Sequence, residues 1–516
     1  MKRYLCICAA TFLCGTAVYA QEPEDALRSS WFIPGGSARS TAIGGAIGAL
    51  GGDISASNVN PAGIGMYKNT EFVISPGLMF NSNKINYRDS AGSSKRTAFA
   101  YGPIGFVFGS AKDPRYSKWS STAFAVSVTQ LASYNNHASY AGFNNISSYS
   151  EKYLEELTRD RADTISAYNN YLNGASLAFG SFLIDTALDG NKQLIGYQSL
   201  VPDSSGIYQQ YDSKTTGGFH EVAFAFAGNT ADRLYLGMSV NVPIESYHRD
   251  LYYRETDASG NPNNDFNYFE YREQFKSSGI GLNAKLGMIY RATSALRLGL
   301  AFHTPSIMSF KDELRASITT DSENYLTVPP HVNTESSDAR NNGAPITRSY
   351  YQLTPYRAIV SGSYVFNAVA DTKQQRGFVS ADVEFVNYRG TRYYADNNED
   401  ESATDYYKAL NSTTKDYLKG ALNVRVGGEL KFDPLLFRAG IAYYGSPYND
   451  KTLKASRTML SGGLGYRAHG MFIDLTYAYS FNKDVNFPYR LADKPNTYAV
   501  TKNNRGNLLL TVGFKI

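Results

Sequence analysis

The segment that decides the fold is residues 234–244, with the sequence LYLGMSVNVPI. Its even-numbered positions are all leucine, methionine, valine or isoleucine, and its odd-numbered positions are mostly small or polar. Because side chains on a β-strand alternate between two faces, the segment is predicted to be a strand with one apolar face. Residues 422–432 and 471–481 repeat the pattern.

Alternation alone does not separate a soluble β-sandwich from a membrane barrel, but the number and spacing of the strands do. A spanning strand needs about 9–11 residues, and bacterial barrels have an even number of strands, with short turns at one end and longer loops at the other. Fourteen strands are expected to begin near Thr70, Lys95, Ser120, Thr216, Arg233, Asp265, Ala295, Tyr350, Gln375, Leu418, Leu435, Lys454, Gly470 and Val500.

The connections between these strands differ at the two ends. Brief turns are expected at 229–232, 292–294 and 432–434, whereas 135–214, 320–349 and 394–415 are long and polar. Residues 70–516 are therefore predicted to form an all-β fold, a 14-stranded antiparallel transmembrane β-barrel with extracellular loops. The last strand alternates up to Phe514 and Ile516, as is typical of the terminal strand that the barrel assembly machinery recognises in the outer membrane.

The first twenty residues resemble a secretory signal peptide. Lys2 and Arg3 precede a short apolar run, and Ala20 offers a small residue for cleavage, so residues 1–20 are expected to be removed. A lipoprotein signal at Cys14 is disfavoured because Phe12 and Leu13 are bulky. All 3 cysteines lie in this segment, so the mature chain is expected to have neither a disulfide framework nor a cysteine zinc site.

The composition excludes several classes of protein. The mean hydropathy is −0.34, with 43% hydrophobic and 19% charged residues, which does not fit an intrinsically disordered chain. The net charge of +4 is no sign of nucleic-acid binding, and the sequence beyond the signal has no run of eighteen apolar residues that could form a membrane helix. The 41 tyrosines are typical of aromatic girdles at the two interfaces of a membrane barrel.

Residues 21–69 precede the first strand and are rich in small residues. Glycine and alanine dominate 35–53, and Asn60-Pro61-Ala62-Gly63 follows. Such a segment can pack its backbone closely against a barrel wall. The glycine spacing matches neither the dinucleotide-binding fingerprint nor a Walker sequence.

This small-residue segment, the Asn60-Pro61-Ala62-Gly63 motif and the fourteen strands together resemble the FadL/TodX-type transporters of the Gram-negative outer membrane, which take up long-chain fatty acids and other hydrophobic compounds. The resemblance implies that 21–69 is a hatch that plugs the barrel, with Asn60, Pro61, Ala62 and Gly63 as its motif. It further implies passive uptake through a pocket beside the hatch and a lateral gap at a kinked third strand, here near 130–133. We expect a monomer in contact with outer-membrane lipid and lipopolysaccharide.

Charged residues are expected on the inward faces of the strands. They are Glu245, Lys285, Arg291, Arg297, His303, Asp382, Glu384, Arg425, Glu429, Lys431, Arg438 and Asp474. The simpler interpretation is a mixed-charge lumen that holds the hatch through ion pairs. The sharper hypothesis is that Lys285 or Arg425 receives a ligand carboxylate through charge-assisted hydrogen bonds.

A helical insertion is expected at about 143–190, in an outer loop. Phe179, Phe182, Leu183 and Ile184 form an apolar patch there, which either collects hydrophobic ligand or packs on neighbouring loops. A second, more polar helical insert is expected at 404–418.

No catalytic arrangement and no cofactor site are predicted. His220-Glu221 begins a zinc-protease pattern, but Phe224 stands where the second histidine is needed. Two alternative functions remain open at this stage. One is a haemin-binding outer-membrane receptor that uses His137, His331 and loop tyrosines, and the other is a barrel associated with protein secretion.

Overall fold

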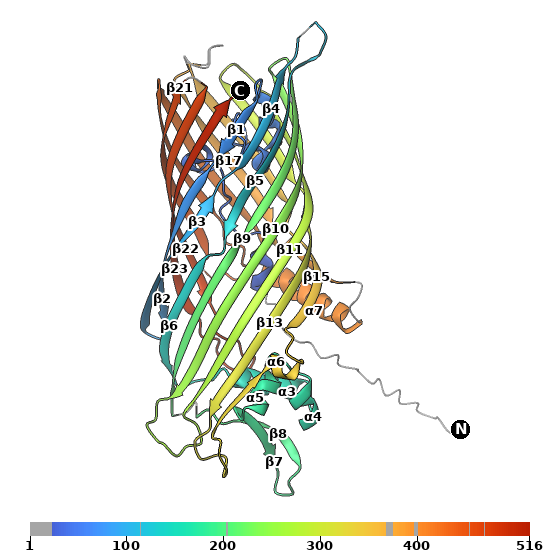
Figure 1. The fold of residues 1–516 in the computed structure, drawn as a ribbon, viewed down its shortest axis with the longest axis vertical. Coiled ribbons are helices and arrows are strands. Elements are labelled where there is room, and N and C mark those ends of the chain that lie inside the picture. The colour runs from blue at the N-terminus through green and yellow to red at the C-terminus, as the bar shows by residue number, and fades with distance from the viewer. Residues whose placement is uncertain are drawn as a thin grey trace, which may run out of the picture.

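The chain forms a closed antiparallel β-barrel of fourteen strands in the computed structural model (Figure 1). The structure describes residues 23–113, 115–202, 205–367, 375–396, 401–453, 455–468 and 470–516. The predicted signal peptide and the predicted strand start at Lys454 lie outside these residues. The fold class predicted from alternation is confirmed.

Several of the fourteen barrel strands are interrupted, and each interrupted strand consists of two consecutive β elements. In barrel order the elements are β1 (Glu71–Ile74) with β2 (Pro76–Tyr87), β3 (Ser90–Tyr101) with β4 (Ile104–Ala111), β5 (Trp119–Ser133) with β6 (Asn136–Asn144), β9 (Ile207–Thr230), β10 (Leu234–Asp257), β11 (Tyr268–Arg291), β12 (Leu296–His303) with β13 (Ile307–Asp321), β15 (Ile346–Leu353) with β16 (Arg357–Phe366), β17 (Gly377–Asn387) with β18 (Arg392–Ala395), β19 (Gly420–Phe432), β20 (Leu435–Tyr444), β21 (Ser456–Ala468), β22 (Met471–Asn486) and β23 (Ala499–Lys515). β1 and β2 both pair with β23, and this pairing closes the barrel.

The remaining elements lie in the N-terminal segment and the long loops. They are η1 (Pro23–Leu27), α1 (Ala38–Ala42), α2 (Ala56–Val59), η2 (Pro61–Met66), α3 (Glu151–Arg159), α4 (Thr164–Asn169), α5 (Ala175–Gly180), β7 (Ile184–Leu188), β8 (Leu194–Ser199), β14 (Val332–Ser336), α6 (Ser337–Arg340), η3 (Tyr388–Gly390) and α7 (Glu401–Tyr417). Helices therefore occur in both predicted inserts. No helix in the described parts of the chain is long and apolar enough to cross a bilayer.

The three longest strands, β9, β10 and β11, have 24 residues each, more than twice the predicted length. At about 3.3 Å per residue each is about 80 Å long, far more than a bilayer of about 30 Å requires even when the strand is tilted. In β10 the outward-facing large apolar side chains end at Ile244, and the outward positions beyond it include His248, Asp250 and Arg254. On β10 the apolar belt thus lies in the half nearest the short turns, and the strand continues beyond it with polar outward positions.

This extension explains the largest error in the predicted strand boundaries. The fourth strand was expected to begin at Thr216, but β9 begins at Ile207. The alternation of apolar and polar residues reports only the lipid-facing half of a strand, because the outer half has water on its outward face.

Candidate functional site

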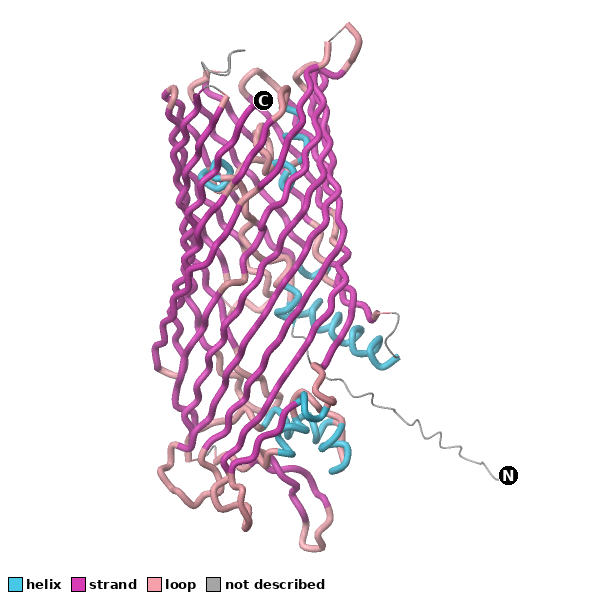
Figure 2. Tube along the Cα trace, in the orientation of Figure 1, coloured by secondary structure: helices cyan, strands magenta, loops and turns pink. Residues whose placement is uncertain are grey.

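The N-terminal segment lies inside the barrel, with its helices enclosed by the strands (Figure 2). Backbone atoms along this segment bond to inward-facing side chains of strands far away in the sequence. The amide of Ala38 donates to Thr511 Oγ1 (2.7 Å) and its carbonyl accepts from Thr476 Oγ1 (2.6 Å). Arg297 Nη1 donates to the Leu50 carbonyl (2.9 Å). The segment is therefore fastened to several parts of the wall.

Asn60 is the most extensively bonded residue of the predicted hatch motif. Its Nδ2 atom donates to the carbonyl of Gly48 (2.7 Å) and lies 3.2 and 3.3 Å from those of Met288 and Leu300, while its Oδ1 atom accepts from the Ala62 amide (3.2 Å). The side chain thus caps η2 and joins two turns of the segment to the wall. An asparagine is suited to this position because its amide both donates and accepts.

Glycines permit the close approach of the motif to the wall. A Cβ atom at Gly237 would lie 2.5 Å from backbone atoms of Pro61 and Ala62, and one at Gly287 would lie 2.0 Å from Asn60 Oδ1. Gly63 packs in the same way against Gly51 within the segment. The motif and the wall glycines therefore form one tightly fitted contact.

The inward-facing charges predicted from the sequence are buried or half-buried, and most of them form ion pairs. Arg438 donates to Glu429 and to Asp474, both at 2.7 Å. Other charged groups contact the N-terminal segment: Arg39 lies 3.5 Å from Glu429, and Asp382 accepts from the Gly48 amide (3.1 Å). The structure thus has the mixed-charge lumen of the simpler interpretation.

Lys285 and Arg425, the two candidate carboxylate contacts, already have acidic partners. Lys285 is buried and forms an ion pair with Glu221. Arg425 is also buried, and its Nη1 and Nη2 atoms lie 2.9 Å from Glu384 and 3.6 Å from Asp382. Both cations are paired with carboxylates of neighbouring wall strands, so a ligand carboxylate would have to compete with these partners.

A cavity of about 300 Å³ lies beside the N-terminal segment. Its floor includes Ile33, Gly35 and Gly36 of that segment, and its wall comes from β2, β19–β23 and the bend between β5 and β6. Apolar groups such as Leu131 and Met459 line it together with polar ones. Its volume is at the lower end of the range for small-molecule pockets.

The cavity reaches the barrel wall where the hydrogen-bond ladder is interrupted. The β4–β5 ladder ends at the pair Ile104–Val128, and β3 pairs with β2 but, in the described residues, forms no ladder with β5. A β-bulge lies at Gln130–Ala132, and the Gln130 side chain accepts from the Tyr101 amide (3.3 Å) in place of a ladder bond. This is the position at which the kink was expected, 130–133, although the strand contains no glycine or proline.

The N-terminal segment covers the inner side of this interruption. The Gly35 amide donates to the Leu131 carbonyl (3.0 Å). A Cβ atom at Gly35 would lie 2.2 Å from the Gln130 carbonyl oxygen, and one at Gly102 would lie 2.4 Å from that of Gly36. Glycine at both positions therefore lets backbone lie directly on backbone.

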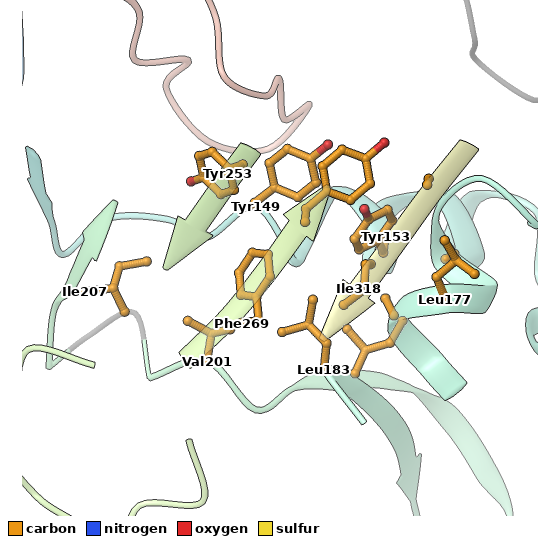
Figure 3. Packing of buried hydrophobic residues seen from close by; sticks show 14 of the residues in the cluster. Tyr149, Tyr153, Leu177, Leu183, Val201, Ile207, Tyr253, Phe269 and Ile318 are labelled. Carbon is orange, nitrogen blue, oxygen red and sulfur yellow. The ribbon is translucent and has the colours of Figure 1, made fainter. Parts of the chain in front are cut away.

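The apolar patch predicted in the outer insertion is largely packed inside the loops. Leu183 and Ile184 are fully buried, and Phe179 and Phe182 are half-buried. Figure 3 shows Leu183 among other buried side chains of the cluster, including Leu177, Phe269 and Ile318. The expectation of an exposed patch is wrong for Leu183 and Ile184, because α5 and β7 turn them toward the outer ends of β11 and β13; packing on neighbouring elements is the alternative that the structure favours.

This outer-loop cluster surrounds a buried carboxylate. Glu255 accepts from Ser148 Oγ (2.5 Å), Tyr253 OH (2.6 Å) and the Tyr149 amide (2.9 Å), and burial raises its pKa. Its bonds join the loop to the outer end of β10. The cluster is therefore a compact cap at the long-loop end of the barrel.

The sequence interpretation missed Arg457 and Arg505, which line the cavity, and Trp31, which is buried next to Arg457. Trp31 belongs to the N-terminal segment, and its ring lies 3.9 Å from the guanidinium carbon of Arg457. The signal for the arginines was available in the alternation, because Arg457 shares strand parity with buried Met459 and Arg505 with buried Leu509. No group of three or more His, Cys, Asp or Glu side chains in the described residues is arranged to hold a metal ion.

Comparison with known proteins finds similarity in the fold alone. No family model and no curated protein matches the sequence. Among solved structures, a FadL homologue from Pseudomonas aeruginosa has 14% identity and a TM-score of 0.57, with 93% of this chain and 98% of that one covered. The toluene transporters TodX of P. putida and TbuX of Ralstonia pickettii have 11% and 16% identity and TM-scores of 0.52 and 0.50, with 94% of this chain and 99% of each of theirs covered. The chain thus has the FadL/TodX-type outer-membrane transporter fold.

Proposed function

We propose that this chain is an outer-membrane uptake channel for hydrophobic molecules, long-chain fatty acids among them, in a Gram-negative bacterium. The observation that carries the proposal is a cavity that borders both the N-terminal segment and the interrupted ladder near Tyr101 and Gln130. In this proposal residues 21–69 are the hatch, and Asn60, Pro61, Ala62 and Gly63 fix it to the wall.

The proposed path avoids a continuous aqueous pore. A hydrophobic ligand gains about 0.8 kcal/mol for each CH₂ group removed from water, so binding in the cavity needs no energy source. From the cavity the ligand leaves sideways, between β3 and β5, into the lipid that surrounds the apolar belt. The chain acts as a monomer, without a cofactor and without catalysis, and the barrel assembly machinery inserts it through its last strand, β23.

The proposal is tested by uptake of radiolabelled oleate into a Gram-negative host that lacks its own outer-membrane fatty-acid channel. Expression of the chain is expected to restore uptake. The lateral step is tested with the pair Tyr101→Cys and Gln130→Cys, which lie on opposite sides of the interruption. All natural cysteines lie in the first 14 residues, so a disulfide between the two new residues has no competing thiol in the predicted mature chain.

The oxidised pair is expected to block uptake, and a reducing agent is expected to restore it. Uptake that is equal with and without the disulfide would exclude the lateral route. Failure of the unmodified chain to restore uptake would contradict the proposed function itself.

A further inference from the structure

The arginines in the lumen differ in whether they have an acidic partner. Arg425 and Arg438 each contact two carboxylates. Arg457 and Arg505 also point into the lumen and line the cavity, but neither forms an ion pair in the described part of the chain. This difference separates arginines that hold the wall together from arginines that face open space.

The Arg457 side chain packs on an aromatic ring and makes no hydrogen bond to the described residues. Its guanidinium lies over Trp31, which in turn packs edge-on against Tyr448 with 5.9 Å between ring centroids. Its Nε atom is buried without a partner. A guanidinium carries five N–H donors, so nearly the full donor capacity of Arg457 remains available.

Arg505 is similarly underused. Its Nε atom donates to Asn81 Oδ1 (2.9 Å), which is the one hydrogen bond of the guanidinium to the described residues. The strand register places the two arginines close together. Arg457 on β21 pairs with Asn482 on β22, which pairs with Asn503 on β23. Arg505 is two residues beyond Asn503, on the same face of β23. They are thus two strands apart, about 10 Å at the backbone, which long side chains can bridge toward a common ligand.

The cavity has more positive than negative charge. Among its lining residues Asp484 is the one carboxylate, and it has interactions of its own. Lys483 also borders the cavity, but it is exposed and has the outward strand parity of Phe481, and Arg425 is paired with Glu384 and Asp382. Two poorly hydrogen-bonded guanidinium groups in a half-buried cavity are suited to bind an anion through charge-assisted hydrogen bonds.

We propose that Arg457 and Arg505 bind the anionic head group, a carboxylate or phosphate monoester, of an amphiphile whose tail lies on Ile33, Leu131 and Met459. The inference rests on the proposed function and narrows its substrate class to anionic amphiphiles. It replaces Lys285 and Arg425 as head-group contacts. Trp31 is a positioning residue, because it orients the Arg457 guanidinium.

The test uses Trp31 as the reporter. The chain has two tryptophans, and the other, Trp119, is exposed at the start of β5, at the short-turn end of the barrel, where it pairs with Thr230. In a Trp119→Phe background, the full chain in zwitterionic lipid nanodiscs is titrated with three quenchers of equal length that carry bromine on the carbon next to the head group: 2-bromododecanoate, 2-bromododecyl phosphate and 2-bromododecan-1-ol. Quenching of Trp31 emission gives the Kd of each.

We expect at least one anionic probe to bind about 100-fold more tightly than the alcohol, as two charge-assisted hydrogen-bonding groups allow. Arg457→Gln and Arg505→Gln are each expected to weaken binding of the anionic probe about tenfold and to leave the alcohol unchanged. Arg115→Gln, an exposed arginine at a short turn, is the matched control and is expected to change none of the three. The better anionic probe identifies the head group.

The inference is overturned if the alcohol binds as tightly as both anions, or if the arginine variants weaken all three probes equally. If the alcohol binds and oleate uptake occurs, the proposed function survives that result. If no probe quenches Trp31 and oleate uptake fails as well, both are wrong. Arg457→Lys keeps the positive charge and is expected to retain part of the preference for the anionic probe over the alcohol. As a check of folding, all variants must show the heat-dependent gel mobility of the parent barrel.

Discussion

The lumen contains two regions with inward-facing arginines. In one region the arginine is paired with carboxylates, and in the other no described carboxylate contacts it. Around the N-terminal segment, Arg438 is fully buried between Glu429 and Asp474. In the cavity, Arg457 is half-buried and stacks on Trp31 without a carboxylate in contact. The first region is filled and joined to the segment, whereas the second is open space of about 300 Å³.

The difference shows what each charge does. A buried cation with two carboxylate partners fixes the geometry around it, and removal of one member leaves the other charges uncompensated. A cation beside a cavity has no such constraint and keeps its hydrogen-bonding capacity for a ligand. Pairing with carboxylates therefore distinguishes Arg438 from Arg457, although both side chains are on the inward faces of their strands.

The largest expected effect comes from breaking the paired region. Arg438→Met leaves Glu429 and Asp474 buried without their shared cation, which is expected to destabilise the barrel by about 3–5 kcal/mol. The measurement is the urea midpoint of unfolding in detergent, followed by the heat-dependent gel mobility. Arg115→Gln is the control, since its partner Asp113 is on an exposed turn. An unchanged midpoint for Arg438→Met would mean that the network does not support the wall.

A second effect tests whether the outer-loop cluster is independent of both lumen regions. Leu183→Ala removes a fully buried side chain and is expected to destabilise the cluster locally by about 2–5 kcal/mol. Faster proteolysis and hydrogen exchange are expected within 145–200, with the N-terminal segment unchanged. Ile165→Ala, at a side chain that is 72% exposed, is the matched control. Equal effects of the two would show that Leu183 does not pack as described.

A smaller effect concerns the contact between the hatch motif and the wall. Gly237→Ala puts a methyl group into the backbone of Pro61 and Ala62, whereas Gly362→Ala on β16 has nothing within 4 Å. We expect Gly237→Ala to cost about 1–3 kcal/mol through overpacking. Hydrogen exchange in residues 48–66 is expected to rise in this variant alone. The same exchange in both variants would mean that the motif is not held by this fit.

Most of the barrel could be predicted from the sequence because the lipid-facing side chains repeat with period two. The alternation in 234–244 and 422–432 marks spanning strands, and the Asn60 motif marks a segment that packs on backbone. The outer halves of β9, β10 and β11 could not be predicted in this way, because water on both faces removes the apolar repeat.

The candidate site was harder to predict because alternation gives the face of a residue and not its partner. Lys285 and Arg425 were correctly placed inside, yet their carboxylates come from other strands, Glu221 on β9 and Glu384 on β17. Arg457 had the same parity signal, but its lack of a partner depends on the register of β21, β22 and β23 together. The burial of Leu183 likewise depends on how a long loop folds back on β11 and β13.

The smallest expected change in stability comes from a substitution that gives Arg457, in the cavity region, a carboxylate partner. Asn482 lies beside Arg457 in the ladder, and its Oδ1 atom is buried without a partner, so Asn482→Asp supplies a carboxylate in the same volume. Because the new charge meets an existing cation, the free energy of unfolding is expected to change by about 1 kcal/mol or less. The anionic probe is expected to bind about tenfold more weakly, since the arginine is now neutralised internally. Asn482→Ala, which removes the amide without adding charge, is expected to leave the preference for the anion intact. If Asn482→Asp and Asn482→Ala bind the anion equally well, then the charge of Arg457 does not select the ligand, and the two regions of the lumen differ in packing alone.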